Sequence, residues 1–243
     1  MQHSKNVLIV GGAGGIGREV VIRMLEDPKV DKVYATYHNA PPKLQHEKLT
    51  WYRLDCTKES EFHELSMSIA SHNNTLDWVV NCVGVLHGEG FSPEKNVMNI
   101  NGEGFLKIMS VNALATLLLA KYLQPLIRRS LEPRFVAISA KVGSISDNRL
   151  GGWYSYRCSK AALNMAVKNL SIEWQRIMPN VAVVAFHPGT TNTSLSAPFQ
   201  ARVAPEKLFE PEYVAKVIGT LLHRLSPNDN GRFIAYNQDT LPW

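Results

Sequence analysis

The sequence predicts a single α/β domain built on a doubly wound, parallel seven-stranded sheet with helices on both faces. Short apolar, β-branched runs alternate with helix-like patterns along all 243 residues, and this alternation is typical of parallel sheets covered by helices. The first run ends in a glycine-rich turn that opens a helix, and the chain has no low-complexity linker or internal repeat. Although the chain exceeds the ~150 residues of a typical domain, α/β folds of this size often form one unit.

The N-terminal part predicts four strands and two helices. A β-branched run at 7–10 ends in glycines, and helical spacing follows over 16–26 until Pro28 stops it. Thr57 is the expected N-cap of the second helix, because its hydroxyl can accept a bond from the helix start. The remaining elements of this part are predicted as strands at 32–37, 50–54 and 76–82 and a helix at 58–71.

The C-terminal part opens with an irregular segment at 85–101 and predicts three more strands. Its most apolar stretch, 105–127, carries Lys107, Asn112 and Lys121. It therefore indicates a buried helix, because a membrane span needs ~20 nearly uninterrupted apolar residues. The expected elements are, in order, a helix at about 103–123, a strand at 135–139, a helix at 153–178, a strand at 181–186, a loop at 190–207, a helix from 211 to about 225 and a strand at 232–235.

The composition argues against several functional classes. The chain has 26 Lys and Arg against 21 Asp and Glu, but the basic residues are scattered, so nucleic-acid binding has little support. Cys56, Cys82 and Cys158 are an odd number without C-x-x-C spacing, and the eight His form no metal-ligand pattern. We therefore expect no disulfide framework and no metal, and a cytoplasmic, reducing location. The first residues show none of the order of a signal peptide.

The glycine turn in VLIVGGAGGIGREV indicates a site for a dinucleotide pyrophosphate. A strand that turns into a helix through glycines lets the N–H groups at the helix start approach the phosphates, and the helix dipole favours their charge. Gly11, Gly15 and Gly17 occupy the positions assigned to this task, and Ile16 opens the helix. A merely flexible loop is the alternative, but the place of the turn between the first strand and a helix favours binding.

With this G-x-x-x-G-x-G spacing, the chain resembles the short-chain dehydrogenase/reductase family. Within that family, YSYRCSKAALN and HPGTTNT are most similar to the small C-factor-like carbonyl reductases. The resemblance implies a Rossmann-type sheet, with a cofactor half at about 1–135 and a catalytic and substrate half at about 136–243. The further motifs that carry it follow the family's order: Asp55 after the third strand, Asn81-Cys82-Val83-Gly84 after the fourth, Asn112 in the long helix, Tyr156-x-x-x-Lys160, and Pro188-Gly189 after the sixth strand.

Tyr156 and Lys160 form the candidate acid/base pair. Their i, i+4 spacing puts both side chains on one helix face. A lysine ammonium there is expected to lower the phenol pKa from ~10 towards neutrality, so that the tyrosine can give a proton to an alkoxide or take one from an alcohol. A solvated pair on a helix surface is the alternative, which the order of the other motifs disfavours.

The resemblance assigns roles to several other residues. It implies that Asn112 holds a water that connects to Lys160, although an Asn on the polar side of the helix is the alternative. It implies that Asp55 contacts adenine, although an acid at a helix start is nearly as plausible. The cofactor contacts that we expect are Gly11, Gly15, Ile16, Gly17, His38, Asp55, Cys56, Asn81, Val83, Gly84, Tyr156, Lys160, Pro188, Gly189, Thr191 and Thr193.

The end of the second strand indicates which cofactor the site prefers. An NAD-specific site places Asp or Glu there to bind the ribose hydroxyls, and such an acid repels a 2′-phosphate. This chain has His38 instead, with Arg18 and Lys43 as helpers. The sequence therefore favours NADP, with NAD as the other possibility.

The family's carbonyl-polarising serine is absent from its usual place after the fifth strand. Without gaps that place falls on Ala140, which has no hydrogen-bond donor. Ser139 belongs to the strand and is expected to point to the opposite face. Ser144, in the loop beyond Gly143, is the candidate substitute, and loss of such a donor typically costs roughly 10²–10³ in rate.

Two functions remain open on the sequence alone. The first is NADP-dependent carbonyl reduction or alcohol oxidation of a small molecule, with Asn112, Ser144, Tyr156 and Lys160 as catalytic residues. The second is a catalytically impaired, cofactor-binding regulatory or signalling protein, which Ala140 favours. The segments 85–101 and 190–207 that shape the substrate pocket carry no motif. The resemblance implies a homodimer or homotetramer formed through the two long helices.

Overall fold

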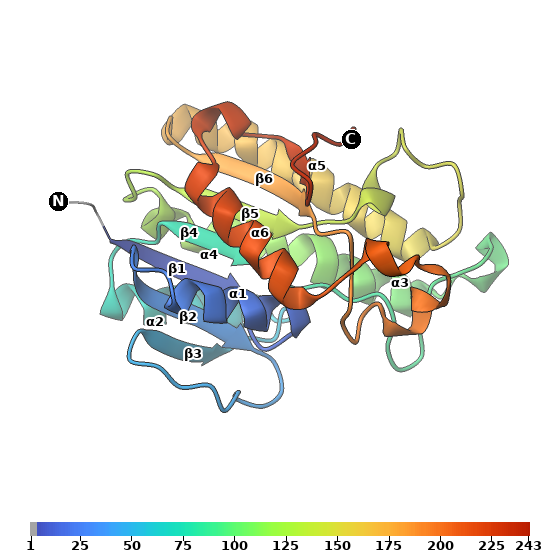
Figure 1. The fold of residues 1–243 in the computed structure, drawn as a ribbon, viewed down its shortest axis with the longest axis horizontal. Helices are drawn as coiled ribbons and strands as arrows, with labels where there is room; N and C mark the ends of the chain where they lie inside the picture. Colours follow the sequence, from blue (N-terminus) through green and yellow to red (C-terminus); the bar gives the residue numbers. More distant parts are fainter. Residues whose placement is uncertain (1–3) are drawn as a thin grey trace.

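The computed structural model describes residues 4–243 and confirms the predicted fold class. Seven parallel strands form one sheet in the order β3-β2-β1-β4-β5-β6-β9 (Figure 1). Residues 1–3 lie outside the described residues. The expectation that the chain begins without a signal peptide falls partly on them. The strands are β1 (Lys5–Val10), β2 (Val30–Tyr37), β3 (Leu49–Arg53), β4 (Trp78–Asn81), β5 (Arg134–Ile138), β6 (Ala182–His187) and β9 (Phe233–Ala235).

The central strands explain why the sequence shows continuous apolar runs in place of alternation. Every residue of β1, β4 and β5 is buried, because helices cover both faces of a parallel sheet. The switch in strand order lies between β1 and β4, which pair directly. In doubly wound sheets ligands bind outside the carboxyl ends of the strands at this point.

Two helical layers enclose the sheet. Helices α1 (Gly15–Leu25) and α6 (Pro211–Arg224) cover one face (Figure 1), where Met24 and Ile218 join the same buried cluster. Helices α2 (Glu59–His72), α4 (Ala115–Ile127) and α5 (Tyr154–Ile177) enclose the core on the other face.

The long apolar helix extends further than predicted and contains an irregular turn. It comprises α3 (Gly102–Met109), a π-helical turn (Ser110–Leu114) and α4, and it continues past Pro125 to Ile127. Burial of the last turn against the sheet outweighs the disruption from the proline. By length and mean hydropathy, 1.4, the stretch Gly102–Ile127 could cross a membrane, but half of its most apolar window is buried in this fold.

Two predicted helix starts are wrong by one residue. Lys58, and not Thr57, is the N-cap of α2. The Thr57 N–H and hydroxyl donate to Asp55 Oδ1 at 3.0 and 2.7 Å, which gives the backbone a turn before the helix begins. Trp153 precedes α5 and does not belong to it.

The predicted loop at 190–207 has some structure of its own. The short strands β7 (Thr190–Thr191) and β8 (Leu208–Phe209) pair at its ends. A 3₁₀ segment, Ala197–Arg202, lies between them. The pairing closes this segment into a flap at the carboxyl edge of the sheet.

Candidate active site

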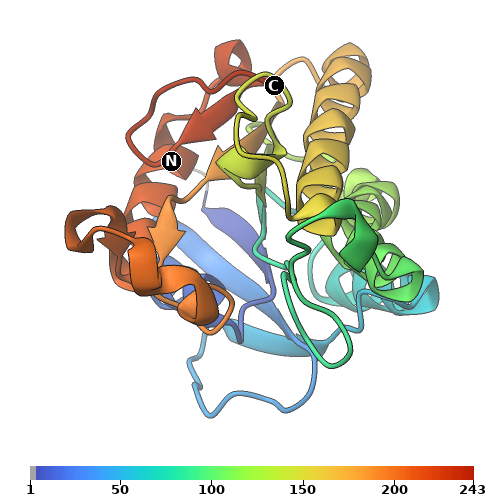
Figure 2. The ribbon, with the colours of Figure 1, turned by 90° about the vertical axis from the view of Figure 1, so that its right-hand side faces the viewer.

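A cleft of about 460 Å³ lies at the carboxyl edge of the sheet, which Figure 2 views end-on. The glycine turn, the loops after β4, β5 and β6, and the start of α5 all contribute to its walls. Because parallel strands bring their carboxyl ends to one edge, motifs as far apart in sequence as Gly15 and Thr193 meet here.

The glycine turn presents an open helix start to this cleft. Gly11 has a φ of +77°, and its N–H donates to Thr36 Oγ1 at 2.9 Å. A side chain at Gly17 would overlap the Gly11 carbonyl oxygen, so the turn can pack this tightly only with glycine. No side chain among the described residues caps α1 at Gly14. Gly15, Ile16 and Gly17 line the cleft, and their position fits the binding of an anionic pyrophosphate.

The loop after β4 forms the next wall of the cleft. The side chain of Asn81 accepts from the Val83 N–H at 3.0 Å and donates to Thr116 Oγ1 at 2.9 Å. Asn81 therefore braces the loop, and it is Cys82, Val83 and Gly84 that line the cleft. Burial raises the pKa of Cys82 to about 12, so it remains a thiol at neutral pH.

Tyr156, Lys160 and Asn112 come together behind this loop. Lys160 Nζ donates to the Ile138 carbonyl at 2.9 Å and lies 5.8 Å from the centroid of the Tyr156 ring. Asn112 is 1% exposed, which excludes the surface alternative. Its amide bonds both main-chain polar groups of Val85, at 2.7 and 2.9 Å, and Ser159 Oγ at 2.9 Å.

The network shows a bracing role for Asn112 that the sequence reasoning missed. Its side chain fixes the segment after Gly84, beside the lysine. The π-helical turn that contains Asn112 is a frequent feature of functional sites. Ser159 is part of the same brace, because its hydroxyl also donates to the Tyr156 carbonyl at 2.8 Å. The sequence signal for this role was the position of Ser159, a polar residue on a helix face that is otherwise buried.

Burial controls the protonation of the pair. It raises the pKa of Tyr156 above its usual value and lowers the pKa of Lys160 to about 8. The expectation that the ammonium brings the phenol towards neutrality does not hold for the protein alone. The physical reason is that burial disfavours the phenolate, while Lys160 Nζ is directed to the Ile138 carbonyl. Tyr156 therefore keeps its proton at neutral pH.

The structure corrects the prediction that Ser144 replaces the missing serine. Ala140 does line the cleft, whereas Ser144 is not among the lining residues. Ser144 Oγ donates to the Trp243 carbonyl at 3.2 Å and accepts from the Asp147 N–H at 3.2 Å. Gly143 packs so closely on the backbone of Lys160 that a side chain there would overlap it, which fixes the loop immediately before Ser144.

Ser139 also directs its hydroxyl elsewhere, as strand geometry predicts. Its Oγ donates to Asn164 Oδ1 of α5 at 2.6 Å, within the core. Ser139 is among the residues that line the cleft, but its hydroxyl is already bonded to Asn164. Neither Ser139 nor Ser144 thus supplies the cleft with the hydrogen-bond donor that Ala140 lacks.

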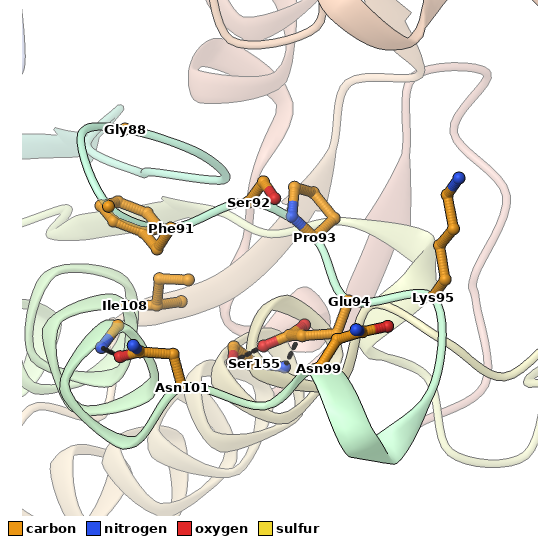
Figure 3. A pocket seen from close by; sticks show the side chains of 12 residues that line it. Gly88, Phe91, Ser92, Pro93, Glu94, Lys95, Asn99, Asn101, Ile108 and Ser155 are labelled. Carbon is orange, nitrogen blue, oxygen red and sulfur yellow. Dashed lines mark hydrogen bonds between the residues drawn. The ribbon is translucent and has the colours of Figure 1, made fainter.

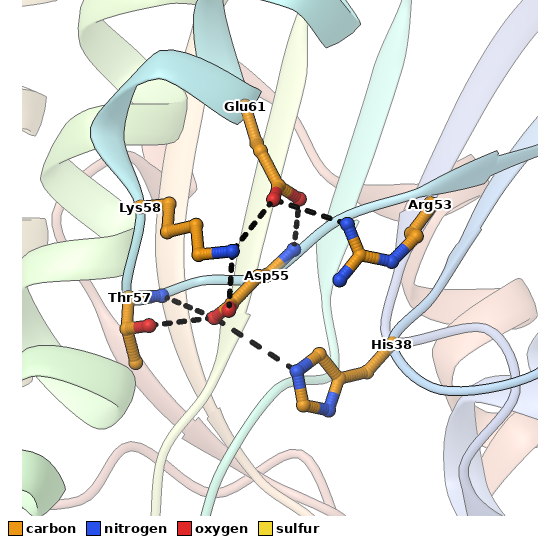
Figure 4. Close-up of polar contacts among 6 residues, drawn as sticks. All are labelled: His38, Arg53, Asp55, Thr57, Lys58 and Glu61. Atoms are coloured by element: carbon orange, nitrogen blue, oxygen red, sulfur yellow. Dashed lines mark hydrogen bonds and ion pairs between the residues drawn. The ribbon is translucent and has the colours of Figure 1, made fainter.

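The residues expected near adenine and its ribose form a separate polar cluster (Figure 4). Asp55 Oδ1 lies 3.9 Å from His38 Nε2, and Lys58 Nζ lies 3.7 Å from Asp55 Oδ2. Glu61 accepts from the Asp55 N–H at 2.7 Å and pairs with Arg53 at 3.1 Å. Bonds from Thr57 hold the pKa of Asp55 below its usual value. The cluster contains acidic and basic side chains, and His38 is exposed to solvent.

Cys56, Arg18 and Lys43 were also expected to contact the cofactor or to assist His38. They differ in whether their side chains are free to bind a ligand. Cys56 is buried in the core, and burial raises its pKa to about 12. Arg18 pairs with Glu19 at 2.5 Å. Lys43 is exposed.

The segment after β6 completes the cleft on the side of the glycine turn. Pro188, Gly189, Thr191 and Thr193 all line it. Thr191 Oγ1 is buried and has no hydrogen-bond partner among the described residues. Buried hydroxyls nearly always have a partner, so this orphan group fits a site that holds a polar ligand.

Aromatic side chains close the outer part of the cleft. Phe199, from the flap, packs edge-on against Trp153, with ring centroids 5.1 Å apart, and lies 5.7 Å from His87. Trp153 in turn lies 6.2 Å from the Tyr156 ring. Trp153 and Phe199 thus give the outer cleft an apolar lining, whereas Phe209 is not among the lining residues and packs on Tyr236.

Comparison with known proteins gives concordant results. A family model described as short chain dehydrogenase matches residues 5–204. C-signal of Myxococcus xanthus is 30% identical over 137 residues, which are 56% of this chain and 77% of that protein. An (S)-benzoin-forming benzil reductase of Saccharomyces cerevisiae is 26% identical over 98% of this chain and 97% of its own. The NADPH-bound carbonyl reductase from chicken fatty liver has the same fold, with a TM-score of 0.86 and 24% identity, over 99% of this chain and 100% of that one.

Proposed function

Because the chain belongs to the short chain dehydrogenase family, we propose that it is an NADP-dependent carbonyl reductase, which in reverse oxidises the alcohol. The resemblance drawn from the motifs is confirmed. The observation that carries the proposal is the meeting of Tyr156 and Lys160 with the open glycine turn in one cleft. A proton donor and a pyrophosphate site in that arrangement suit hydride transfer to a carbonyl carbon.

The residues of the cleft fit a dinucleotide. The uncapped start of α1 suits the pyrophosphate, and the orphan hydroxyl of Thr191 suits the nicotinamide end. When bound, NADPH supplies a hydride to the carbonyl carbon, the carbonyl π pair moves to oxygen and takes a proton, and the products are the alcohol and NADP⁺.

Tyr156 and Lys160 divide the proton chemistry between them. The Tyr156 hydroxyl gives its proton to the substrate oxygen as negative charge develops there. Lys160, whose pKa of about 8 lies near physiological pH, can return a proton to the tyrosinate and take one from water. Asn112 keeps the neighbouring loop in place through its three bonds.

The preference for NADP rests on charge. His38 stands where an NAD-specific site has an acid, and His38 and Lys58 both lie beside Asp55. These groups can receive a 2′-phosphate, provided that their attraction exceeds the repulsion from Asp55 and Glu61. NAD is the weaker ligand in this proposal.

Ala140 and the relative named C-signal favour a second candidate, a cofactor-binding signalling protein with little turnover. A panel of ketones, aldehydes and aromatic diketones, benzil among them, separates the two functions. We expect consumption of NADPH at 340 nm with at least one compound. Tight NADPH binding without consumption of the cofactor by any compound would refute the reductase and favour the signalling protein.

Exposed apolar side chains on two helices support the homodimer. Leu114 and Leu117 lie on the long helix, and Met165 and Ile172 lie on α5, each at least 41% exposed. A face of this kind suits an isologous contact with a second copy, or two such contacts in a tetramer. The free thiols support a reducing location such as the cytoplasm.

A further inference from the structure

Trp153 lines the cleft, and its indole N–H is a hydrogen-bond donor in addition to the Tyr156 hydroxyl. We propose that the indole N–H of Trp153 bonds the substrate oxygen and replaces the hydroxyl that Ala140 does not have. The inference rests on the proposed reductase function and deepens it. It would make Trp153 a catalytic residue, because its N–H would touch the reacting oxygen.

The backbone of Trp153 is held in an unusual conformation. Its φ is +50°, in the left-handed region, which is rare for a bulky side chain. Two glycines with φ of +62° and +65°, Gly151 and Gly152, lead into it. Strain of this kind persists only where surrounding contacts impose it, and it is concentrated at functional sites. Here it places the indole at the first turn of the helix that carries Tyr156.

Glu94 provides the contacts that impose this conformation. Its main-chain carbonyl accepts from the Trp153 N–H at 2.6 Å. Its carboxylate, in a residue that is 6% exposed, accepts from the N–H of Ser155 at 3.1 Å and from the Ser155 hydroxyl (Figure 3). A carboxylate is favourable at a helix start. Glu94 therefore holds both Trp153 and the first turn of the helix that follows it.

The second cavity of the protein surrounds this anchor. It measures about 600 Å³ and is lined mainly by residues 88–108, with Glu94 and Ser155 on its wall. Glu94 thus links the irregular segment after β4 to the catalytic helix. In this proposal it is a positioning residue, because it bonds the Trp153 N–H and does not itself line the cleft.

The indole N–H is free to receive a substrate. Among residues 4–243, only the indole of Trp51 donates a hydrogen bond, to the Leu44 carbonyl at 2.9 Å, and Trp153 is the one of the other four tryptophans that lines the cleft. Indole is a donor only, and Trp153 is half-buried, so its N–H is accessible to an acceptor that enters the cleft. Because Trp153 lines the cleft between Tyr156 and Phe199, a bound carbonyl oxygen is the acceptor that the site offers.

The two donors then have separate tasks. The rings of Trp153 and Tyr156 are 6.2 Å apart and inclined by 71°, so the two side chains border the same part of the cleft. As the carbonyl π pair moves to oxygen, the phenol proton is transferred and the indole keeps its own. The indole bond strengthens as charge develops, as oxyanion donors do.

A double-mutant cycle tests the proposal by kinetics. Trp153→Phe keeps an aromatic ring and removes the donor, and it should lower kcat for the best substrate of the panel by a factor of roughly 10², with KM changed less than about fivefold. Ala140→Ser should then raise kcat at least tenfold more in the Trp153→Phe background than in the natural chain. A merely structural role of Trp153 predicts no such coupling.

A second readout does not depend on turnover. With ¹⁵N-labelled indoles, the resonance that disappears in Trp153→Phe should shift downfield when benzil is added to the protein with NADP⁺, while the Trp51 resonance stays in place. No shift, or a kcat for Trp153→Phe within threefold of the natural chain, would overturn the proposal and leave the reductase standing. Turnover that appears only in Ala140→Ser would also overturn it. Absence of turnover in both chains would mean instead that the proposed function itself is wrong.

Discussion

Replacing Tyr156 by Phe isolates one proton from everything else in the cleft. The Tyr156 hydroxyl has no hydrogen-bond partner among the described residues, and the residue as a whole is 8% exposed. Phe therefore keeps the packed ring and sacrifices no internal bond, so the free energy of unfolding should change by less than about 1 kcal/mol, or ~2–4 °C in Tm. General acid catalysis contributes typically 10²–10⁴-fold, and kcat should fall by that factor.

The assay compares three quantities for the two chains. NADPH consumption at saturating substrate gives kcat, fluorescence transfer from tryptophan to NADPH gives the Kd of the cofactor, and thermal melting gives Tm. We expect loss of kcat alone, with the Kd within a few-fold. An unchanged kcat would mean that another group is the acid, and a large fall in Tm would mean that the hydroxyl has a structural partner.

Three further predictions concern protonation, packing and cofactor choice. Because burial lowers the pKa of Lys160 to about 8, the unfolded chain binds its proton more tightly between about pH 8 and 10.5; the free energy of unfolding should therefore rise with pH in that window, and this rise should be missing in Lys160→Met. Ser144→Ala removes two bonds near the C-terminus and should lower stability by ~1–3 kcal/mol with kcat within threefold, whereas a hundredfold loss of kcat would restore Ser144 to the reaction. NADPH should bind at least tenfold more tightly than NADH, about 1.4 kcal/mol, and His38→Asp should abolish that difference; tighter binding of NADH by the natural chain would refute the assignment.

Local patterns in the sequence were sufficient for the sheet and for the glycine turn between β1 and α1. Strand runs, the glycines after β1 and the i, i+4 spacing of Tyr156 and Lys160 each depend on residues close in sequence. Strand alternation also predicted correctly that the Ser139 hydroxyl points away from the cleft. The helix boundaries were less certain, because the Thr57 side chain had two bonding choices and turned to Asp55.

The features that the sequence did not predict depend on contacts between residues that are far apart in the chain. The direction of Ser144 depends on how closely Gly143 packs on Lys160 and on a carbonyl 99 residues away, at Trp243. The anchor of Ser155 on Glu94 joins residues 61 positions apart, in a segment without periodicity. No local pattern encodes either contact.

The central claim is that this cleft transfers a hydride from NADPH to a carbonyl carbon with Tyr156 as the acid. The most direct measurement supplies NADPH deuterated at the transferred position of C4 together with the best substrate of the panel, and determines the mass of the product. The account predicts an alcohol that carries one deuterium on the former carbonyl carbon, formed by the natural chain and at least a hundredfold more slowly by Tyr156→Phe. Binding of the labelled cofactor without any deuterated alcohol, across the whole panel, would contradict it.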